Sequence, residues 1–314
     1  MKHAISWLCC ILLASWTGAA LAGTPPAAAA SAVKPATDAD FAYGAYQRGL
    51  YLTAMNEAKT RLAADPNDGV AMTLIGQLYE QGLGVGQDFA TAARWYRDAA
   101  AHGDEQGIFL YALAKLQGKG VPRDRDGAAA LFTKAAAMNH PGALYNLGVI
   151  AVENNGVAPD FPKAAGYFRR AAELGYPDAA YALALCYRQG RGVPQDDAIA
   201  ARWMKLAADE DQVSAEVEYA IMLFNGVGVA KDERAAAKLF LKAAQEQNVV
   251  AQDRAARLLA LGRGVPKNMV EAMKWHLLAS AAGENDPWLE ALLNQLTPAQ
   301  RVEVDAAVRR ALGR

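Results

Sequence analysis

Cysteine, net charge and strand-forming runs are all scarce in this sequence of 314 residues. Only three cysteines occur, and two of them, Cys9 and Cys10, lie in the N-terminal apolar run. The third, Cys186, has no partner in the rest of the chain, which excludes an intramolecular disulfide framework there and leaves stability to packing. The formal net charge of −1 lacks the basic excess of a nucleic-acid-binding protein.

Runs of Val, Ile and Thr are almost absent, whereas long stretches are rich in Ala, Leu, Lys, Arg, Glu and Gln. This composition predicts an all-α protein. Beyond the N-terminus no segment is apolar over a length that would cross a membrane. We therefore expect no membrane span in the mature chain and no nucleic-acid partner.

The N-terminus has the pattern of a secretory signal peptide. A basic start, MKH, precedes the apolar run AISWLCCILLASW and the small-residue cleavage site Ala20-Leu21-Ala22. We predict a signal peptide over residues 1–22, with cleavage after Ala22 and delivery to the periplasm or beyond. Residues 23–39 are rich in Pro and Ala and are expected to form a flexible spacer.

A loop motif such as GRGVPQD at 190–196 recurs in strict phase along the chain. Its second glycine returns every 36 residues, at Gly84, Gly120, Gly156, Gly192, Gly228 and Gly264. Each of these is followed by Val and, four residues on, by an acid or amide: Asp88, Asp124, Asp160, Asp196, Asp232 and Asn268. The phase favours a structural helix–loop–helix unit over a nucleotide-binding loop.

Each part of the motif has a predicted role. The first glycine (Gly190 in the copy above, and Asn154 in the third copy) suits the left-handed residue that ends a helix. The Asp or Asn then caps the next helix by accepting a backbone N–H. The helix after each loop carries an apolar stripe at i, i+3, i+4 and i+7. One such pair of helices cannot bury its own apolar face, so the pairs must stack as a right-handed α-α superhelix, a solenoid.

The copies GQLYEQGLGVGQDFATAARWYRDAA and GVIAVENNGVAPDFPKAAGYFRRAA resemble Sel-one-like repeats (SLR), which are similar to tetratricopeptide repeats with a longer inter-helix loop. The resemblance covers residues 68–283 as six tandem copies. Residues 40–67 look like an N-terminal tetratricopeptide-like helix pair without the glycine loop. Residues 284–314 should form C-terminal capping helices, where Thr297 to Gln300 has the pattern of a capping box.

The resemblance implies a binding role in the cell envelope, as an adaptor or scaffold for a protein or peptide partner. A Cys-rich secreted branch of the family has been linked to β-lactam binding and hydrolysis. This chain lacks the paired cysteines of that branch, which makes the binding role the first interpretation. A cell-wall or β-lactam-processing enzyme is the alternative function. The sequence leaves the partner and the oligomeric state open.

Groups suited to catalysis are few. His102 ends a second helix, His140 precedes Pro141 in a loop, and His276 replaces an aromatic residue of the apolar stripe. No two histidines have the spacing of zinc ligands. Cys186 falls in a row of core residues and is predicted to be a small core side chain. We predict no catalytic residue, no metal site and no cofactor.

The first helices of the pairs should line the inner surface of the solenoid. Two rows of residues are expected there: Thr73, Phe109, Tyr145, Tyr181, Val217 and Asp253, and then Gln77, Leu113, Val149, Leu185, Ile221 and Arg257. Their apolar centre and polar ends favour an extended peptide or a partner helix. The candidate partner-binding residues are Phe109, Leu113, Tyr145, Val149, Tyr181, Leu185, Arg188 and Ile221. If the repeats pack tightly, these side chains would instead contact the next repeat.

Overall fold

The computed structural model describes residues 41–153 and 158–313, and all regular secondary structure in them is α-helical. The described helices belong to one compact unit, Ala36–Arg314. The predicted signal peptide and spacer lie outside the described residues, as do Asn154 and Gly156. Two N-terminal helices, α2 (Phe41–Gln47) and α3 (Tyr51–Ala64), precede the repeats.

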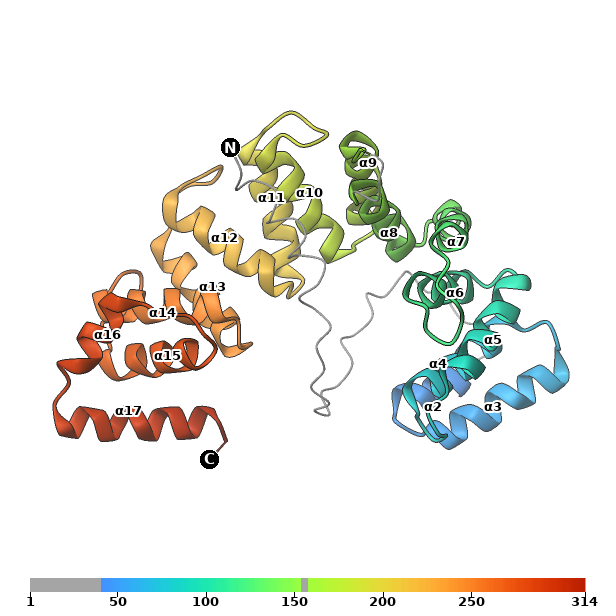
Figure 1. The fold of residues 1–314 in the computed structure, drawn as a ribbon, viewed down its shortest axis with the longest axis horizontal. Helices are drawn as coiled ribbons and strands as arrows, with labels where there is room; N and C mark the ends of the chain where they lie inside the picture. Colours follow the sequence, from blue (N-terminus) through green and yellow to red (C-terminus); the bar gives the residue numbers. More distant parts are fainter. Residues whose placement is uncertain (1–40, 154–157, 314) are drawn as a thin grey trace. The chain divides into compact units, whose positions relative to one another are not determined.

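Six helix pairs follow, and each helix packs chiefly on its neighbours in chain order (Figure 1). We call the two members of each pair its first and second helix, and number the pairs as repeats 1 to 6. They are α4 (Gly69–Gln81) with α5 (Phe89–Ala101), α6 (Glu105–Gln117) with α7 (Arg125–Ala137), α8 (Pro141–Val152) with α9 (Phe161–Glu173), α10 (Pro177–Gln189) with α11 (Asp197–Asp209), α12 (Val213–Asn225) with α13 (Glu233–Gln245), and α14 (Val249–Leu261) with α15 (Met269–Ala281). The predicted all-α solenoid is confirmed.

Helix ends within the repeats follow the predicted chemistry. In repeat 4, Gly190 ends α10 with a left-handed φ of 64°, and the Asp196 carboxylate accepts the N–H of Ile199 at 2.9 Å to cap α11. The other predicted caps also accept backbone N–H groups at the start of their helices: Asp88, Asp124, Asp160, Asp232 and Asn268. The short loop therefore has a defined geometry in every described copy.

The second glycine of the loop has a packing role as well as a turn role. Gly192 has φ of 73°, and a Cβ on it would lie 2.2 Å from the carbonyl oxygen of Phe161, the first residue of α9. Equivalent approaches of 2.0 to 2.1 Å to the preceding second helix occur at Gly120, Gly228 and Gly264. Only glycine lets the loop of one repeat rest on the repeat before it.

A second left-handed position lies between repeats and escaped sequence reasoning. Gly103 and Gly175 occupy it in repeats 1 and 3, but Asn139 (φ 67°), Asp211 (φ 59°) and Gln247 (φ 64°) occupy it elsewhere. Because the residue type varies, no single recurring letter marks this turn. The residue after it is the N-cap of the next first helix, and the side chains of Asp104, His140, Gln212 and Asn248 accept a backbone N–H there, whereas that of Tyr176 does not.

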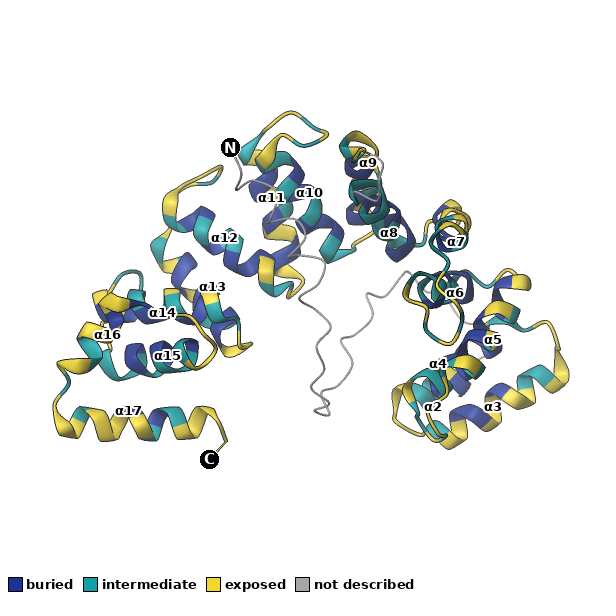
Figure 2. Cartoon of the chain, viewed as in Figure 1, coloured by how far each residue is buried: buried dark blue, intermediate teal, exposed yellow. Residues whose placement is uncertain are grey.

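The core is the predicted apolar stripe of the second helices packed against small residues of the first helices (Figure 2). Phe132 and Met204 are fully buried, and His276, in the same row, is 1% exposed. Small residues are required opposite them: a Cβ on Gly76 would lie 2.5 Å from the ring of Tyr96. Close helix approach thus depends on Gly and Ala in the first helices.

Two helices, α16 (Pro287–Asn294) and α17 (Pro298–Ala311), follow repeat 6. The capping box of Thr297 and Gln300 is present at the start of α17. Leu289 of α16 and Val304 of α17 are buried in the same core cluster as residues of α15. In the described residues no helix combines the length and apolarity that a membrane crossing needs.

Candidate functional site

The candidate site is the surface formed by the two predicted rows on the first helices. In the row that begins with Thr73, Tyr181 is 8% exposed and Val217 is 6% exposed, whereas Phe109 and Tyr145 are half-buried. Every residue of the row that begins with Gln77 is half-buried. We call these the junction row and the open row, because their contacts differ.

Three side chains of the junction row contact the N-cap residue of the next first helix. The Thr73 hydroxyl donates to the Asp104 carboxylate at 2.6 Å. The Phe109 ring stacks on His140 at a centroid distance of 4.2 Å, and Tyr145 lies 5.3 Å from Tyr176. The partner lies 31 residues later in each case. A hydroxyl in the row meets a carboxylate, and an aromatic ring in the row meets another ring. Phe109 and Tyr145 therefore position the next repeat.

Tyr181, the next member of the junction row, has little surface left for a partner. Burial raises the pKa of its hydroxyl to about 12, with Glu218 adding to the shift. The alternative that these side chains pack against the next repeat thus agrees with the structure of the junction row. Sequence reasoning could not separate the two rows, because both lie on the same helices and only the capping residues distinguish them.

The open row brings together four of the predicted residues, Leu113, Val149, Leu185 and Ile221, on the successive helices α6, α8, α10 and α12. Each packs at its base against the buried core and keeps part of its side chain accessible. The result is an apolar row along four repeats, with Gln77 and Arg257 in the same register at its ends.

Arg188 lies beside this row and joins two repeats. Its Nη1 donates to the Glu218 carboxylate of α12 at 2.5 Å, and the two side chains keep 30% and 27% of their surface exposed. Sequence reasoning missed Glu218. The signal was available, since Glu218 takes the register of Leu110, Asn146 and Ala182.

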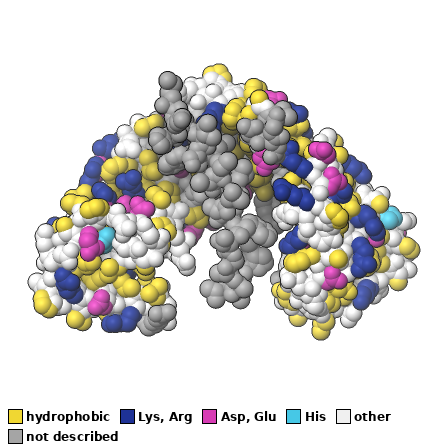
Figure 3. Space-filling model, viewed as in Figure 1, with side chains coloured by type: hydrophobic (Ala, Val, Ile, Leu, Met, Phe, Trp, Pro, Cys, Tyr) yellow, Lys and Arg dark blue, Asp and Glu magenta, His cyan; other side chains and the backbone are white. Residues whose placement is uncertain are grey.

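Other charges on the first helices are also paired. Glu80 contacts Lys119 at 3.1 Å and Lys115 contacts Asp124 at 2.7 Å, while Glu153 contacts Arg125 at 2.8 Å. In the space-filling view, basic and acidic side chains are interspersed over the visible described surface (Figure 3). The charges named here are thus paired within the chain, which favours an uncharged, apolar ligand surface on the open row.

The groups that sequence reasoning considered for chemistry have structural contacts. The His140 Nδ1 accepts the N–H of Ala143 at 3.1 Å, so it caps α8, and its Nε2 donates to Gln106. His276 is buried against Glu290 at 3.1 Å. His102 is exposed at the end of α5 and contacts the carbonyl of Asp98 at 2.8 Å.

Cys186 is 7% exposed, and burial raises the pKa of its thiol to about 11, which disfavours the reactive thiolate. Among the residues that the structure describes, no three His, Cys, Asp or Glu side chains are grouped as metal ligands.

Two solved structures share both fold and sequence similarity with the chain. A Sel1 repeat protein from Oxalobacter formigenes is 27% identical, with a TM-score of 0.65 over 80% of this chain and 99% of its own. The protein c5321, described as a protective antigen of uropathogenic Escherichia coli with an SLR fold, is 26% identical, with a TM-score of 0.55. That match covers 84% of this chain and 64% of the antigen. No curated protein matches the chain.

A family model described as Sel1 repeat matches six consecutive stretches: residues 69–104, 107–140, 141–176, 177–212, 213–248 and 249–284. Each stretch covers one helix pair of the solenoid and ends just after the turn that follows the second helix; the second stretch begins at Gly107, two residues inside α6. The matches cover more than half of the chain, and their phase is that of the glycine loops. The chain therefore belongs to the Sel1 repeat family.

Proposed function

We propose that this protein is an exported, non-catalytic scaffold of the cell envelope, which binds an apolar segment of a partner protein on the open row. Sel1 repeats typically mediate protein–protein interactions. The observation that carries the proposal is the accessible apolar row Leu113, Val149, Leu185 and Ile221 on four successive first helices.

The form of the row indicates the form of the partner. Apolar positions that recur once per repeat suit a peptide or helix that lies across several first helices, so that each repeat contributes a small contact. Because neighbouring charges are paired within the chain, the affinity should depend mainly on apolar burial and weakly on salt. The basis for export is the sequence of residues 1–22, and that part of the proposal rests on sequence alone.

The proposal is tested by a crosslinked pull-down from a periplasmic extract, with residues 23–314 as bait. A Val149→Gln/Leu185→Gln variant makes the open row polar. The matched control is Leu206→Gln, which alters a leucine on the second helix α11 that is 38% exposed. All three baits are first compared by circular dichroism and melting temperature.

A partner that binds the wild type and the Leu206→Gln control, but not the double variant, would support binding at the open row. Capture that the double variant retains would contradict this site. If no bait captures a protein, the scaffold function itself is contradicted, and hydrolysis of a chromogenic β-lactam by the same preparation becomes the next measurement.

A further inference from the structure

In repeats 2, 4 and 6 the residue between the two glycines of the loop is basic and contacts the preceding repeat. In repeat 2 this residue is Lys119, whose ammonium group lies 4.3 Å from the ring centroid of Phe89, the first residue of α5. The same ammonium group lies 3.1 Å from the Glu80 carboxylate of α4. One basic side chain thus joins the loop to both helices of repeat 1.

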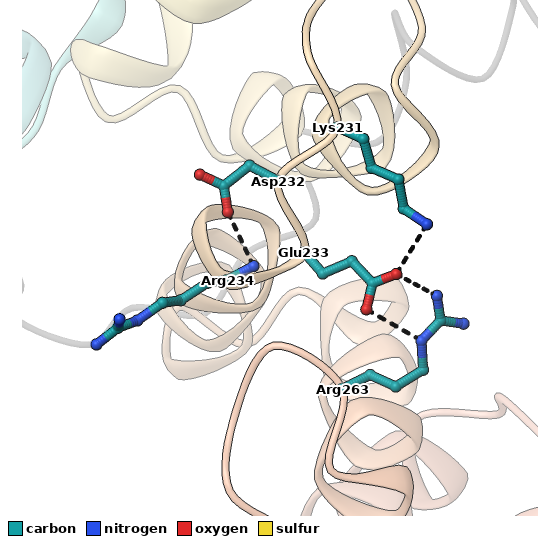
Figure 4. Close-up of polar contacts among 5 residues, drawn as sticks. All are labelled: Lys231, Asp232, Glu233, Arg234 and Arg263. Carbon is teal, nitrogen blue, oxygen red and sulfur yellow. Dashed lines mark hydrogen bonds and ion pairs between the residues drawn. The ribbon is translucent and has the colours of Figure 1, made fainter.

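Repeat 6 has the same pair of contacts in the opposite arrangement. The carboxylate now starts the preceding second helix, and the aromatic ring lies on the preceding first helix. Arg263 pairs with Glu233, the first residue of α13, with its Nη2 at 2.5 Å and its Nε at 3.2 Å from the two carboxylate oxygens (Figure 4). Its guanidinium lies 4.4 Å from the ring of Phe224 on α12. Lys231 reaches the same carboxylate at 2.9 Å. These interactions lower the pKa of Glu233 to about 2, with Arg263 as the largest cause.

Repeat 4 has the contact in a simpler form, since Arg191 lies 5.4 Å from the ring of Phe161, the first residue of α9. We call these interactions loop-edge contacts. They link repeats 1 and 2, 3 and 4, and 5 and 6. The equivalent residue of repeat 3 lies outside the described residues.

The junction of repeats 4 and 5 lacks a loop-edge contact. Val227 occupies the position between the two glycines and is 40% exposed. The residue that starts the preceding second helix is Asp197, and no described cation lies within ion-pair distance of its carboxylate. The loop backbone is the same as in repeat 6, because Gly226 and Gly228 have φ of 72° and 67° against 72° and 71° there. The absence therefore comes from the side chain alone.

This junction is held at three other places, one of which is a hydrogen bond from Gln212 Nε2, at the start of α12, to the Asp178 carboxylate of α10 at 3.4 Å. Arg188 pairs with Glu218 between the first helices, and Lys242 of α13 pairs with Asp211 in the turn that precedes α12. Both ion pairs lie away from the loops. The loop edge of the junction thus depends on apolar packing and backbone contact alone.

The packing near this junction also contains a buried charge. Glu216 is fully buried in the register that holds Met72, Ile108, Leu144 and Ala180 in the earlier repeats. Its one described cationic partner is Lys242, at 2.5 Å. An ion pair in place of an aliphatic contact adds little net stability after desolvation. With no loop-edge contact and a buried ion pair nearby, the loop edge between repeats 4 and 5 is held less firmly than those between repeats 1 and 2, 3 and 4, and 5 and 6.

We propose that the junction of repeats 4 and 5 is a hinge of the solenoid, which opens at the loop edge and turns about the Arg188–Glu218 and Lys242–Asp211 ion pairs. Leu185 and Ile221 lie on opposite sides of the hinge, so opening changes the spacing of the open row. The hinge depends on the contacts between repeats and not on what the open row binds.

Amide hydrogen exchange on the full chain, analysed by mass spectrometry, tests the hinge. In the wild type, amides of α12 should exchange faster than those of α10 and α14. Val227→Arg should supply the missing contact with Asp197 and slow exchange in α12 by about two- to fivefold, the effect of one half-exposed ion pair. Arg263→Val is the reciprocal variant, and it should speed exchange in α14 by a similar factor.

Exchange in α8, remote from both substitutions, reports whether a variant has changed global stability. The hinge would be overturned by wild-type α12 amides that exchange no faster than those of α10 and α14. It would equally be overturned if Val227→Arg folds as the wild type does and leaves α12 exchange unaltered. If Val227→Arg fails to fold, the wild-type comparison and Arg263→Val decide the question.

Discussion

At the scale of single residues, His140 shows how one side chain can both cap a helix and join two repeats. Its Nδ1 accepts a backbone N–H at the start of α8, its Nε2 donates to Gln106, and its ring stacks on Phe109. The two hydrogen bonds require the neutral ring, since a protonated Nδ1 cannot accept. Burial lowers the pKa of His140 to about 4, below the ordinary value near 6.5.

This lowered pKa predicts a pH-dependent stability. The unfolded chain binds a proton at His140 below about pH 6.5, whereas the folded chain does so only near pH 4, so stability should fall as the pH drops between these values. At pH 5 the loss should approach about 2 kcal/mol relative to pH 7. Urea unfolding at both pH values measures it.

His140→Asn is the matched variant for that measurement, because Asn also caps helices but does not titrate. The variant should be less stable at pH 7, since it loses the stacking on Phe109, and its dependence on pH between 7 and 5 should be weaker. An equal pH dependence in both proteins would assign the effect to other groups.

At the scale of helices, the C-terminal end of the array is closed by α17. Its first turn is fixed by the capping box of Thr297 and Gln300, and Val304 and Ala307 are buried while Val302 on the same helix is 65% exposed. A terminal repeat without such a cover would expose its apolar face to water. The contribution of α17 to the free energy of unfolding should therefore come from a few buried side chains.

Val304→Ala should lower the free energy of unfolding by about 2 kcal/mol, because it removes buried methyl groups and leaves a cavity. Val302→Ala, two residues away on the exposed side, should change it by less than about 0.5 kcal/mol. Chemical denaturation of the two variants measures the difference. Equal effects would mean that α17 does not cover repeat 6 as described.

The helices also show what the sequence could and could not predict. Gly190 and Asp196 were predictable because their roles depend on backbone conformation and on hydrogen bonds a few residues away. The role of Phe109 was not, because its partner His140 lies 31 residues later and has a different chemistry in each repeat. The role of Glu218 was not predictable for the same reason, because its partner Arg188 lies in the preceding repeat.

At the scale of the whole molecule, the phase of 36 residues predicted the number of repeats and the fold class, because every repeat contributes the same packing surface to its neighbours. The differences between junctions were not predictable. Lys119, Arg191 and Arg263 occupy a position of the loop with no fixed residue type, and only the structure shows the helices beneath them.

The phase itself predicts that one whole repeat can be removed. Deletion of residues 177–212 joins Tyr176 to Val213 in register and keeps the contact of Tyr176 with Tyr145. The shortened chain should keep its helical signal per residue and unfold cooperatively in circular dichroism. Deletion of residues 177–194 removes α10 but leaves α11 without its partner helix, so helical signal should be lost. Similar spectra from the two deletions would contradict the repeat as the folding unit.

The contacts of the junction row have a consequence for how copies of the repeat could be exchanged. Thr73 meets Asp104, Phe109 meets His140 and Tyr145 meets Tyr176, so each of these three junctions has its own matched pair of side chains. Both members of a pair fall within one stretch that ends at the residue before the next first helix. An exchange with its boundary at that residue would carry the pair intact, whereas a boundary in the loop between the two helices of a repeat would separate its members.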